Sequence, residues 1–241
     1  PSAAENGVGC TGSLSGSSTA SCFHAALAPK SNLIFLYVHG CDGVNLKALD
    51  LLKNLGQMYV APDSLRRPGR KIDCRVSADK KETIRERDQE IDYAIRQIRA
   101  NPKLKNIKIV LMGFSEGAVT VALHRPDVEV ARIVVGWSCQ SADPWYQGLN
   151  SSKTTPVLAI EGSEDHYLQN SSNRGNCSKY MTNKNSKTVV IPHRDHEVLP
   201  EPETKKAIRE FIDELSATTE GDPAKKKPAF NQYSPVRGMS F

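Results

Sequence analysis

Short apolar segments alternate with helical segments along most of this chain. The apolar runs are rich in β-branched and aromatic residues, which is typical of buried strands. They lie at 33–38, 57–61, 107–112, 131–136, 156–161 and 187–191. Apolar residues spaced about 3.6 positions apart predict helices at 45–55, 79–100, 117–124 and 202–214. This alternation predicts an α/β fold with a mostly parallel sheet and helices on both faces, whose ligand site lies beyond the carboxyl ends of the strands.

The alternating region defines the expected domain. Residues 29–215 of the 241 are enough for one domain with a sizeable core, and Pro62 is expected to end the second strand. The segment 1–28, rich in Gly, Ser and Thr, predicts an irregular lead-in, and 216–241 predicts a flexible basic tail. The net charge of +5 is mild and the tail has few aromatics, which favours a solvated tail over a nucleic-acid site. No apolar run approaches the roughly 20 residues of a membrane span.

Six cysteines constrain the compartment. They are Cys10, Cys22, Cys41, Cys74, Cys139 and Cys177. An even number without a Cys-x-x-Cys pair argues against a zinc ribbon and predicts three disulfides, and therefore a secreted or periplasmic protein. Six cysteines allow fifteen connectivities. Our hypothesis is that each cysteine pairs with its neighbour in sequence, so that a Cys10–Cys22 bridge closes the lead-in.

One strand runs directly into a serine between two glycines. "LMGFSEGAV" places Ser115 between Gly113 and Gly117, after an apolar strand and before a helix. Gly-x-Ser-x-Gly in this context is typical of a nucleophile elbow, where glycines let neighbouring backbone approach a sharp turn. The pattern predicts that Ser115 is a catalytic nucleophile.

An acid and a base follow later strands. "IEGSED" offers Glu164 and Asp165, and we favour Asp165 because the Gly-x-x-Asp spacing places it on the loop, pointing back to the sheet edge. "PHRDHEV" offers His193 and His196, and we favour His196 because it lies further along its loop, with room to reach both partners. The order Ser, Asp, His along the chain is the order of α/β-hydrolase triads.

A metal site is the competing interpretation of the histidine loop. His193, Asp195 and His196 carry ligand atoms, but adjacent residues of an extended chain point to opposite sides. No cysteine or third histidine completes the set. We therefore expect no metal at this loop.

The oxyanion hole needs two backbone N–H groups. One is expected from Glu116, the residue after the serine, and the other from "HGCDG" at 39–43, after the first strand. Cys41 is the expected donor there, with Gly40 as the alternative.

The side chain of Glu116 needs a partner if it is buried at the site. The loop after the second strand carries Arg66, Arg67 and Arg70. These arginines either pair with Glu116, bind an anionic group of the substrate, for which Arg66 and Arg70 are our candidates, or lie solvated on a polar loop.

Only about twenty residues separate the strands at 131–136 and 156–161, too few for a large helical lid. This segment contains Trp137, Trp145 and Tyr146. They either line an open, shallow substrate pocket or belong to the core.

Several segments together resemble a known family. "HGCDG", "PDSLRRPGRKIDC", "GFSEGA", "GWSC", "VLAIEGSED" and "HRDHEVL" are similar to the dienelactone hydrolase-related branch of the α/β-hydrolases, over about residues 30–215. The resemblance implies hydrolysis of esters or lactones without a cofactor. It also implies Cys41–Cys74 and Cys139–Cys177 bridges, because these cysteines lie in the similar segments. Dienelactone hydrolase itself uses a cysteine nucleophile, so Ser115 marks a departure that leaves the natural substrate open.

The sequence thus predicts a secreted serine hydrolase that cleaves carboxylic esters or lactones of small molecules through an acyl-enzyme. Two alternatives stay open. One is a catalytically silent binding protein with this fold, and the other is a peptidase or thioesterase using the same triad.

Overall fold

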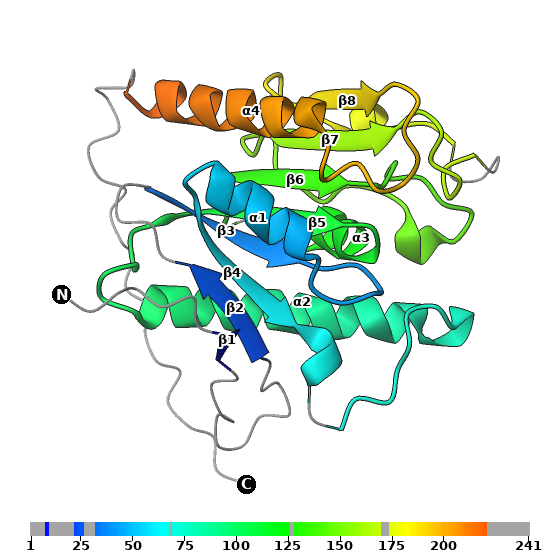
Figure 1. Ribbon diagram of the computed structural model, residues 1–241, viewed down its shortest axis with the longest axis horizontal. Coiled ribbons are helices and arrows are strands. Elements are labelled where there is room, and N and C mark those ends of the chain that lie inside the picture. Colours follow the sequence, from blue (N-terminus) through cyan, green and yellow to red (C-terminus); the bar gives the residue numbers. More distant parts are fainter. Residues whose placement is uncertain are drawn as a thin grey trace, which may run out of the picture.

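The computed structural model describes residues 8–9, 22–26, 32–67, 69–125, 128–169 and 174–220 (Figure 1). Within these ranges eight strands form one sheet in the order β1-β2-β4-β3-β5-β6-β7-β8. The strands are β1 (Val8–Gly9), β2 (Cys22–Ala26), β3 (Leu33–Val38), β4 (Met58–Asp63), β5 (Lys108–Phe114), β6 (Ala131–Val135), β7 (Val157–Gly162) and β8 (Lys187–Ile191). The six strands from β4 to β8 in this order pair in parallel, and β2 and β1 continue the sheet antiparallel at one edge.

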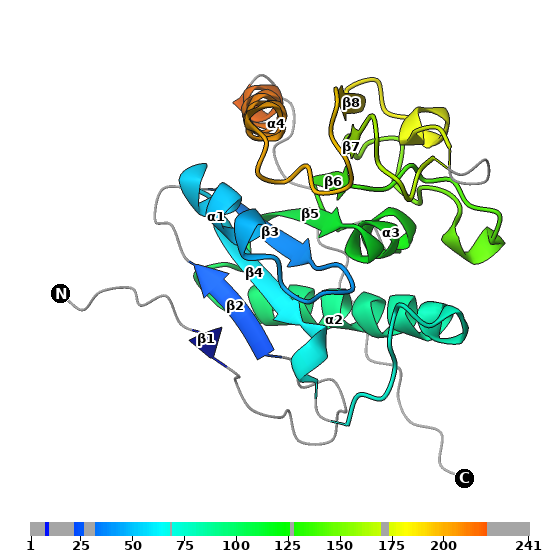
Figure 2. The ribbon, with the colours of Figure 1, turned by 45° about the vertical axis from the view of Figure 1, so that its right-hand side comes forward.

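Helices cover both faces of the sheet, as the alternating pattern predicts. They are α1 (Leu46–Asn54), α2 (Lys80–Ala100), α3 (Glu116–Leu123) and α4 (Pro202–Glu220). Helices α1 and α4 lie on one face and α2 and α3 on the other (Figure 2). Strand β3 shows the period of two behind this arrangement: Phe35 and Tyr37 pack toward α1 and α4, whereas Leu36 and Val38 pack toward α2 and α3. The α/β architecture of the predicted fold class is therefore confirmed.

The register of the sheet brings the strand exits to one edge. Val38 pairs with Gly113, and Phe114 pairs with Val135. Further along, Gly162 pairs with Ile191. The loops after β3, β5, β6, β7 and β8 therefore leave the sheet side by side, and these loops carry the predicted site residues.

No large lid covers this edge within the described residues. The segment between β6 and β7 contains only a short 3₁₀ turn, η3 (Pro144–Tyr146). Among the described helices, none combines the length and the apolar character that crossing a bilayer requires.

Two features at the β2 edge differ from the expectation. Strand β4 continues through Pro62 to Asp63, although Pro62 was expected to end it. Pairing of β4 with β3 stops at Val60, so Pro62 is paired only with β2 and its missing N–H costs little there. Strands β1 and β2 lie within 1–28, which was expected to be irregular.

The structure contains two of the expected disulfides. Cys41 is bonded to Cys74, and Cys139 is bonded to Cys177. The predicted Cys10–Cys22 bridge and most of the predicted tail lie outside the described residues, while α4 continues through the first part of that tail to Glu220.

The packing of α4 gives a test of the fold. Phe211 is 1% exposed and belongs to the cluster between α4 and the sheet. Phe211→Ala should lower the free energy of unfolding by about 3–5 kcal/mol, because the lost transfer energy adds to that of a cavity. Urea denaturation measures this, and Glu210→Ala at the exposed neighbouring position should change it by less than about 0.5 kcal/mol. Equal effects of the two changes would mean that α4 does not pack as described.

Candidate active site

Ser115 has the backbone conformation of a sharp strand-to-helix turn. Its φ of 55° and ψ of −123° lie outside the regions that residues with a side chain normally occupy. The turn joins β5 to α3 and is held by a hydrogen bond of 2.9 Å from the Ser115 N–H to the carbonyl oxygen of Val135. Such strain persists only where surrounding structure imposes it, and it is concentrated at functional sites.

The two flanking glycines allow three backbone segments to meet at this turn. A Cβ on Gly113 would lie 2.3 Å from the carbonyl oxygen of Gly117. A Cβ on Gly117 would lie 2.1 Å from the carbonyl oxygen of Val38. Neither distance is possible for a real side chain, so both positions require glycine, as the sequence motif predicts.

His196 is held by a buried acid. Its Nδ1 lies 2.7 Å from Oδ2 of Asp165, which is fully buried. The imidazole ring stacks obliquely on Phe114, the residue before Ser115, with 5.1 Å between ring centroids. Nε2 of His196 is buried and has no hydrogen-bond partner among the described residues. The acid thus binds one ring nitrogen and leaves the other available for proton transfer.

His193 forms a separate pair in solvent. Its Nδ1 lies 3.1 Å from Oε1 of Glu164, and the two side chains are 89% and 62% exposed. The structure therefore divides the candidates into a largely buried pair, Asp165 with His196, whose side chains are 0% and 16% exposed, and an exposed pair, Glu164 with His193.

Asp195 organises the loops around this buried pair. It accepts hydrogen bonds from Nδ1 and the backbone N–H of His166 and from the backbone N–H of His196. These bonds lower its pKa to about 2. Among the described residues, the group with spacing suitable for a metal is Asp165, His166 and Asp195, rather than the His193, Asp195 and His196 considered above. Its two carboxylates already bind His196 and His166.

A second buried carboxyl lies next to Asp165. Glu161 of β7 is 6% exposed, and burial together with the charge of Asp165 raises its pKa to about 7. Glu161 therefore keeps its proton into the neutral range, which limits the negative charge buried behind the site.

The loop after β3 lies directly against the turn. A Cβ on Gly40 would be 3.2 Å from Cβ of Ser115. The next residue, Cys41, is tied by its disulfide to Cys74. Glu116 begins α3, where a backbone N–H has no intrahelical acceptor. These two positions are the predicted donors of the oxyanion hole, and that role stays a prediction.

The Glu116 carboxylate is buried and accepts a hydrogen bond of 2.7 Å from the hydroxyl of Tyr146. Burial raises its pKa, and the Tyr146 bond and the charge of Arg87 oppose that shift. The partner of Glu116 is therefore Tyr146, and the pairing with a loop arginine that the sequence suggested is not formed.

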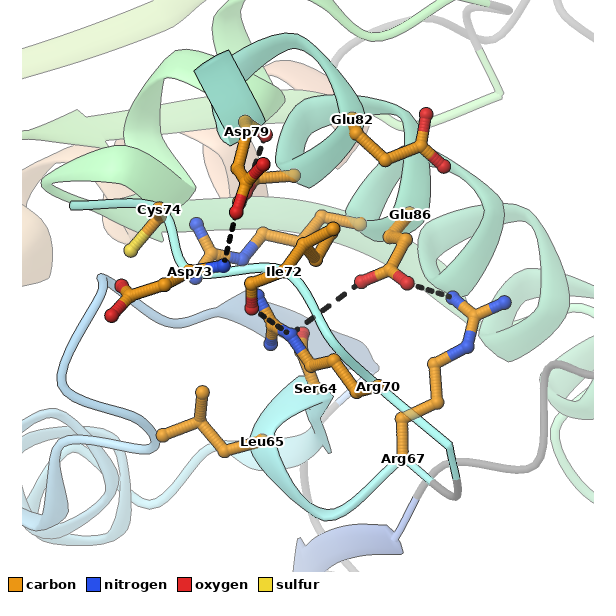
Figure 3. Close-up of polar contacts among 12 residues, drawn as sticks. Ser64, Leu65, Arg67, Arg70, Ile72, Asp73, Cys74, Asp79, Glu82 and Glu86 are labelled. Carbon is orange, nitrogen blue, oxygen red and sulfur yellow. Dashed lines mark hydrogen bonds and ion pairs between the residues drawn. The ribbon is translucent and has the colours of Figure 1, made fainter. Parts of the chain in front are cut away.

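The loop arginines bind other carboxylates (Figure 3). Arg67 lies 3.8 Å from both Glu86 and Glu90, and Arg70 lies 3.6 Å from Glu86. Arg67 and Arg70 also line a cavity of about 360 Å³ next to the Cys41–Cys74 bridge. Arg66 is exposed and lies 3.4 Å from Asp63. Substrate binding by Arg66 and Arg70 stays a prediction.

The three aromatic candidates have different environments. Trp137 and Tyr146 are buried and pack edge to face, with 6.2 Å between ring centroids. Trp145 is 60% exposed, and Nζ of Lys81 lies 3.7 Å from its ring centroid. Sequence reasoning did not identify Tyr167, whose ring lies 4.7 Å from that of His196 at the exposed side. Its position directly after Asp165 and His166 was the available signal.

Comparison with solved structures identifies the fold class. The peroxisomal α/β-hydrolase of Saccharomyces cerevisiae is similar with a TM-score of 0.60 and 11% identity, over 87% of this chain and 84% of that one. An esterase of Pyrococcus furiosus matches with a TM-score of 0.58 and 15% identity, over 80% and 87% of the two chains. Dienelactone hydrolase from Anabaena variabilis matches with a TM-score of 0.54 and 16% identity, over 82% and 91%. The chain has the α/β-hydrolase fold.

A family model narrows this class. The model of the dienelactone hydrolase family matches residues 26–198, about seven tenths of the chain. The chain therefore belongs to the dienelactone hydrolase family, as the sequence resemblance predicts. No curated protein matches it significantly.

The Cys41–Cys74 disulfide, at the loop after β3, gives a test of the predicted donor role of Cys41, and the second disulfide is its matched control. Replacing Cys41 and Cys74 together by alanine should lower the free energy of unfolding by roughly 3 to 4 kcal/mol on the chain-entropy model, and so should replacing Cys139 and Cys177, because the loops span 33 and 38 residues. Only the first change frees the loop beside Ser115, so only it should also lower kcat, measured well below melting. Unchanged kcat in both double variants would mean that the Cys41–Cys74 bridge stabilises the fold and does not affect the site.

Glu161 predicts a pH dependence of stability. Its folded pKa of about 7 lies above the ordinary value near 4.3, so the folded state binds the proton more tightly and loses stability as pH rises between these values. The loss should be at most about 4 kcal/mol at pH 8, because one pKa unit corresponds to about 1.4 kcal/mol. Urea unfolding from pH 4 to 8 should show it in the native chain and not in Glu161→Gln. The exposed-site variant Glu164→Gln should keep the native dependence, and a Glu161→Gln profile parallel to the native one would refute the assignment.

Proposed function

We propose that the protein is a serine hydrolase of carboxylic esters or lactones, with Ser115 as nucleophile, His196 as base and Asp165 as the acid that orients it. The observation that supports this proposal is the hydrogen bond of 2.7 Å between His196 and the fully buried Asp165, beside the strained turn at Ser115. Membership of the dienelactone hydrolase family supports hydrolysis of ester or lactone bonds.

The chemistry follows from the roles of these groups. Asp165 accepts a hydrogen bond from Nδ1–H of His196, so Nε2 carries no proton and can take the Ser115 Oγ proton as Oγ attacks the carbonyl carbon. The N–H groups of Glu116 and Cys41 stabilise the oxygen that becomes negative. His196 then gives its proton to the leaving alcohol oxygen as the ester bond breaks, leaving an acyl-enzyme. Water then gives a proton to His196 as its oxygen attacks the acyl carbon. The bond from the acyl carbon to Oγ breaks, and His196 returns the proton to Oγ, which releases the carboxylic acid and restores Ser115.

We also propose that the protein is secreted or periplasmic. The two described disulfides support this localisation, because structural disulfides persist in oxidising compartments.

The two acid–histidine pairs allow a matched test of the triad. Ser115→Ala and His196→Ala should each lower kcat for p-nitrophenyl acetate by at least 1,000-fold, since serine is a weak nucleophile without a base. His193→Ala should leave kcat within about twofold, because that ring pairs with Glu164 in solvent. Circular dichroism and melting temperature verify that each variant is folded.

The acids extend the comparison. Asp165→Asn should reduce kcat strongly by leaving His196 in the wrong tautomer, whereas Glu164→Gln should not. Greater damage from His193→Ala or Glu164→Gln would move the site to the exposed pair. No Ser115-dependent hydrolysis of esters would favour the silent binding protein, and a preference for thioester or peptide substrates would favour the other alternative.

A further inference from the structure

A buried arginine contacts the loop after β3, one of the two segments that form the proposed oxyanion hole. Arg87 of α2 is 0% exposed, although it carries a guanidinium group. Its Nε and Nη1 have no hydrogen-bond partner among the described residues. Burying a guanidinium group with so few partners costs free energy. The hydrogen bond that Arg87 does make within the described residues therefore indicates why an arginine occupies this position.

That hydrogen bond goes to the loop after β3. Nη2 of Arg87 donates to the carbonyl oxygen of Gly40 at 2.9 Å. The same oxygen lies 2.6 Å from Nδ1 of His39 and 3.4 Å from the N–H of Gly43. Nε2 of His39 accepts from the backbone N–H of Ser64 at 3.0 Å, so the His39 proton is on Nδ1 and is donated to Gly40. Two side chains and one amide thus hold a single carbonyl oxygen.

Peptide geometry links this oxygen to the oxyanion hole. The carbonyl of Gly40 and the N–H of Cys41 belong to one planar trans peptide group, in which they point in opposite directions. Fixing the carbonyl toward α2 therefore fixes the N–H of Cys41 away from α2. Gly40 contacts the Ser115 position, where a Cβ would lie 3.2 Å from Cβ of Ser115. A peptide group that was free to flip would present its oxygen instead of its N–H.

The charge of Arg87 also acts on the second donor. Glu116, whose own N–H is the other proposed donor, has a buried carboxylate that the Arg87 charge stabilises. Reciprocally, Glu116 is the largest favourable charge acting on Arg87. The Tyr146 hydroxyl holds the Glu116 carboxylate from the other side. One cation thus contacts the peptide of the first donor and attracts the side chain of the second.

We propose that Arg87 is a positioning residue that sets the orientation of the Gly40–Cys41 peptide and keeps it next to the first turn of α3, so that both N–H donors are in place before substrate binds. This inference rests on the proposed hydrolase function and assigns the residue that prepares its oxyanion hole. Arg87 itself does not touch the reacting atoms.

Kinetics of Arg87 variants test the role. Arg87→Met should lower kcat for p-nitrophenyl acetate by about 100-fold or more, the typical effect of losing one oxyanion donor, with KM within about threefold. Arg87→Lys should have a kcat at least tenfold higher than that of Arg87→Met. Its ammonium group keeps the positive charge and an N–H donor, although it lacks the planar guanidinium geometry.

Arg132 provides the matched control. It is also 0% exposed and donates to the carbonyl oxygens of Val121 and Ala122, away from the Ser115 end of α3. Arg132→Met should lower the melting temperature and leave kcat within about twofold in protein shown to be folded. Similar losses of kcat in Arg87→Met and Arg132→Met would assign Arg87 a merely structural role and overturn the proposal.

A spectroscopic readout separates this inference from the proposed function. In isotope-labelled protein, the Gly40 carbonyl and Cys41 amide resonances should shift in Arg87→Met and stay in place in Arg132→Met. Resonances that do not move in Arg87→Met overturn the proposal, even if the native chain shows no Ser115-dependent hydrolysis.

Should Arg87→Met not fold, Arg87→Gln replaces it, with an expected loss of at least tenfold in kcat. Native kcat and resonances in Arg87→Gln would overturn the proposal equally.

Discussion

The approach of α3 to β3 is the contact on which the geometry around Ser115 depends. The site for a Cβ on Gly117 is occupied by the carbonyl oxygens of Val38 and His39, at 2.1 and 2.6 Å. Helix α3 can therefore begin at Glu116, directly against the exit of β3, only because residue 117 has no side chain. This contact places the first turn of α3 and the loop after β3 together. The two proposed oxyanion donors come from these two segments.

Buried charges around this contact lie beside opposite charges or hydrogen-bond donors of the protein. Arg87 lies near Glu116 and Glu90, Arg67 lies near Glu86 and Glu90, and the Glu116 carboxylate accepts from Tyr146. A buried pair of this kind contributes little net stability, because desolvation offsets much of the attraction. Such a pair instead disfavours other arrangements of these segments, because separating its two members leaves an unpaired buried charge. These charge pairs and the Tyr146 hydrogen bond therefore favour one arrangement of the segments around Ser115.

The sequence predicted the parts of the fold and site that depend on local pattern. Strands β3 and β8 have the predicted bounds, and the glycines on either side of Ser115 make the predicted close contacts. Both features depend on residues that are close together in the sequence. Strand β2 was missed because its pairing with β4 is long-range and because it directly follows a stretch rich in Gly, Ser and Thr. The partner of Glu116 was missed for a similar reason: Tyr146 is thirty residues away, and only the fold brings its hydroxyl to the carboxylate. Arg87 looked like one charge among many on an amphipathic helix, and burial cannot be read from that pattern.

The choice between the two histidines shows how a fold resolves what a motif leaves open. Both lie on one loop, and each is bonded through Nδ1 to a carboxylate from the loop after β7. The loops are locked together at Gly162, where a Cβ would lie 2.2 Å from the carbonyl oxygen of Arg194 and 2.3 Å from that of Asp195. With the chain fixed there, His193, on one side of this contact, extends into solvent, and His196, on the other, turns in against Phe114. The close contact at Gly162 thus helps to determine which histidine packs against Phe114 beside Ser115, and this is the histidine that we propose as the base.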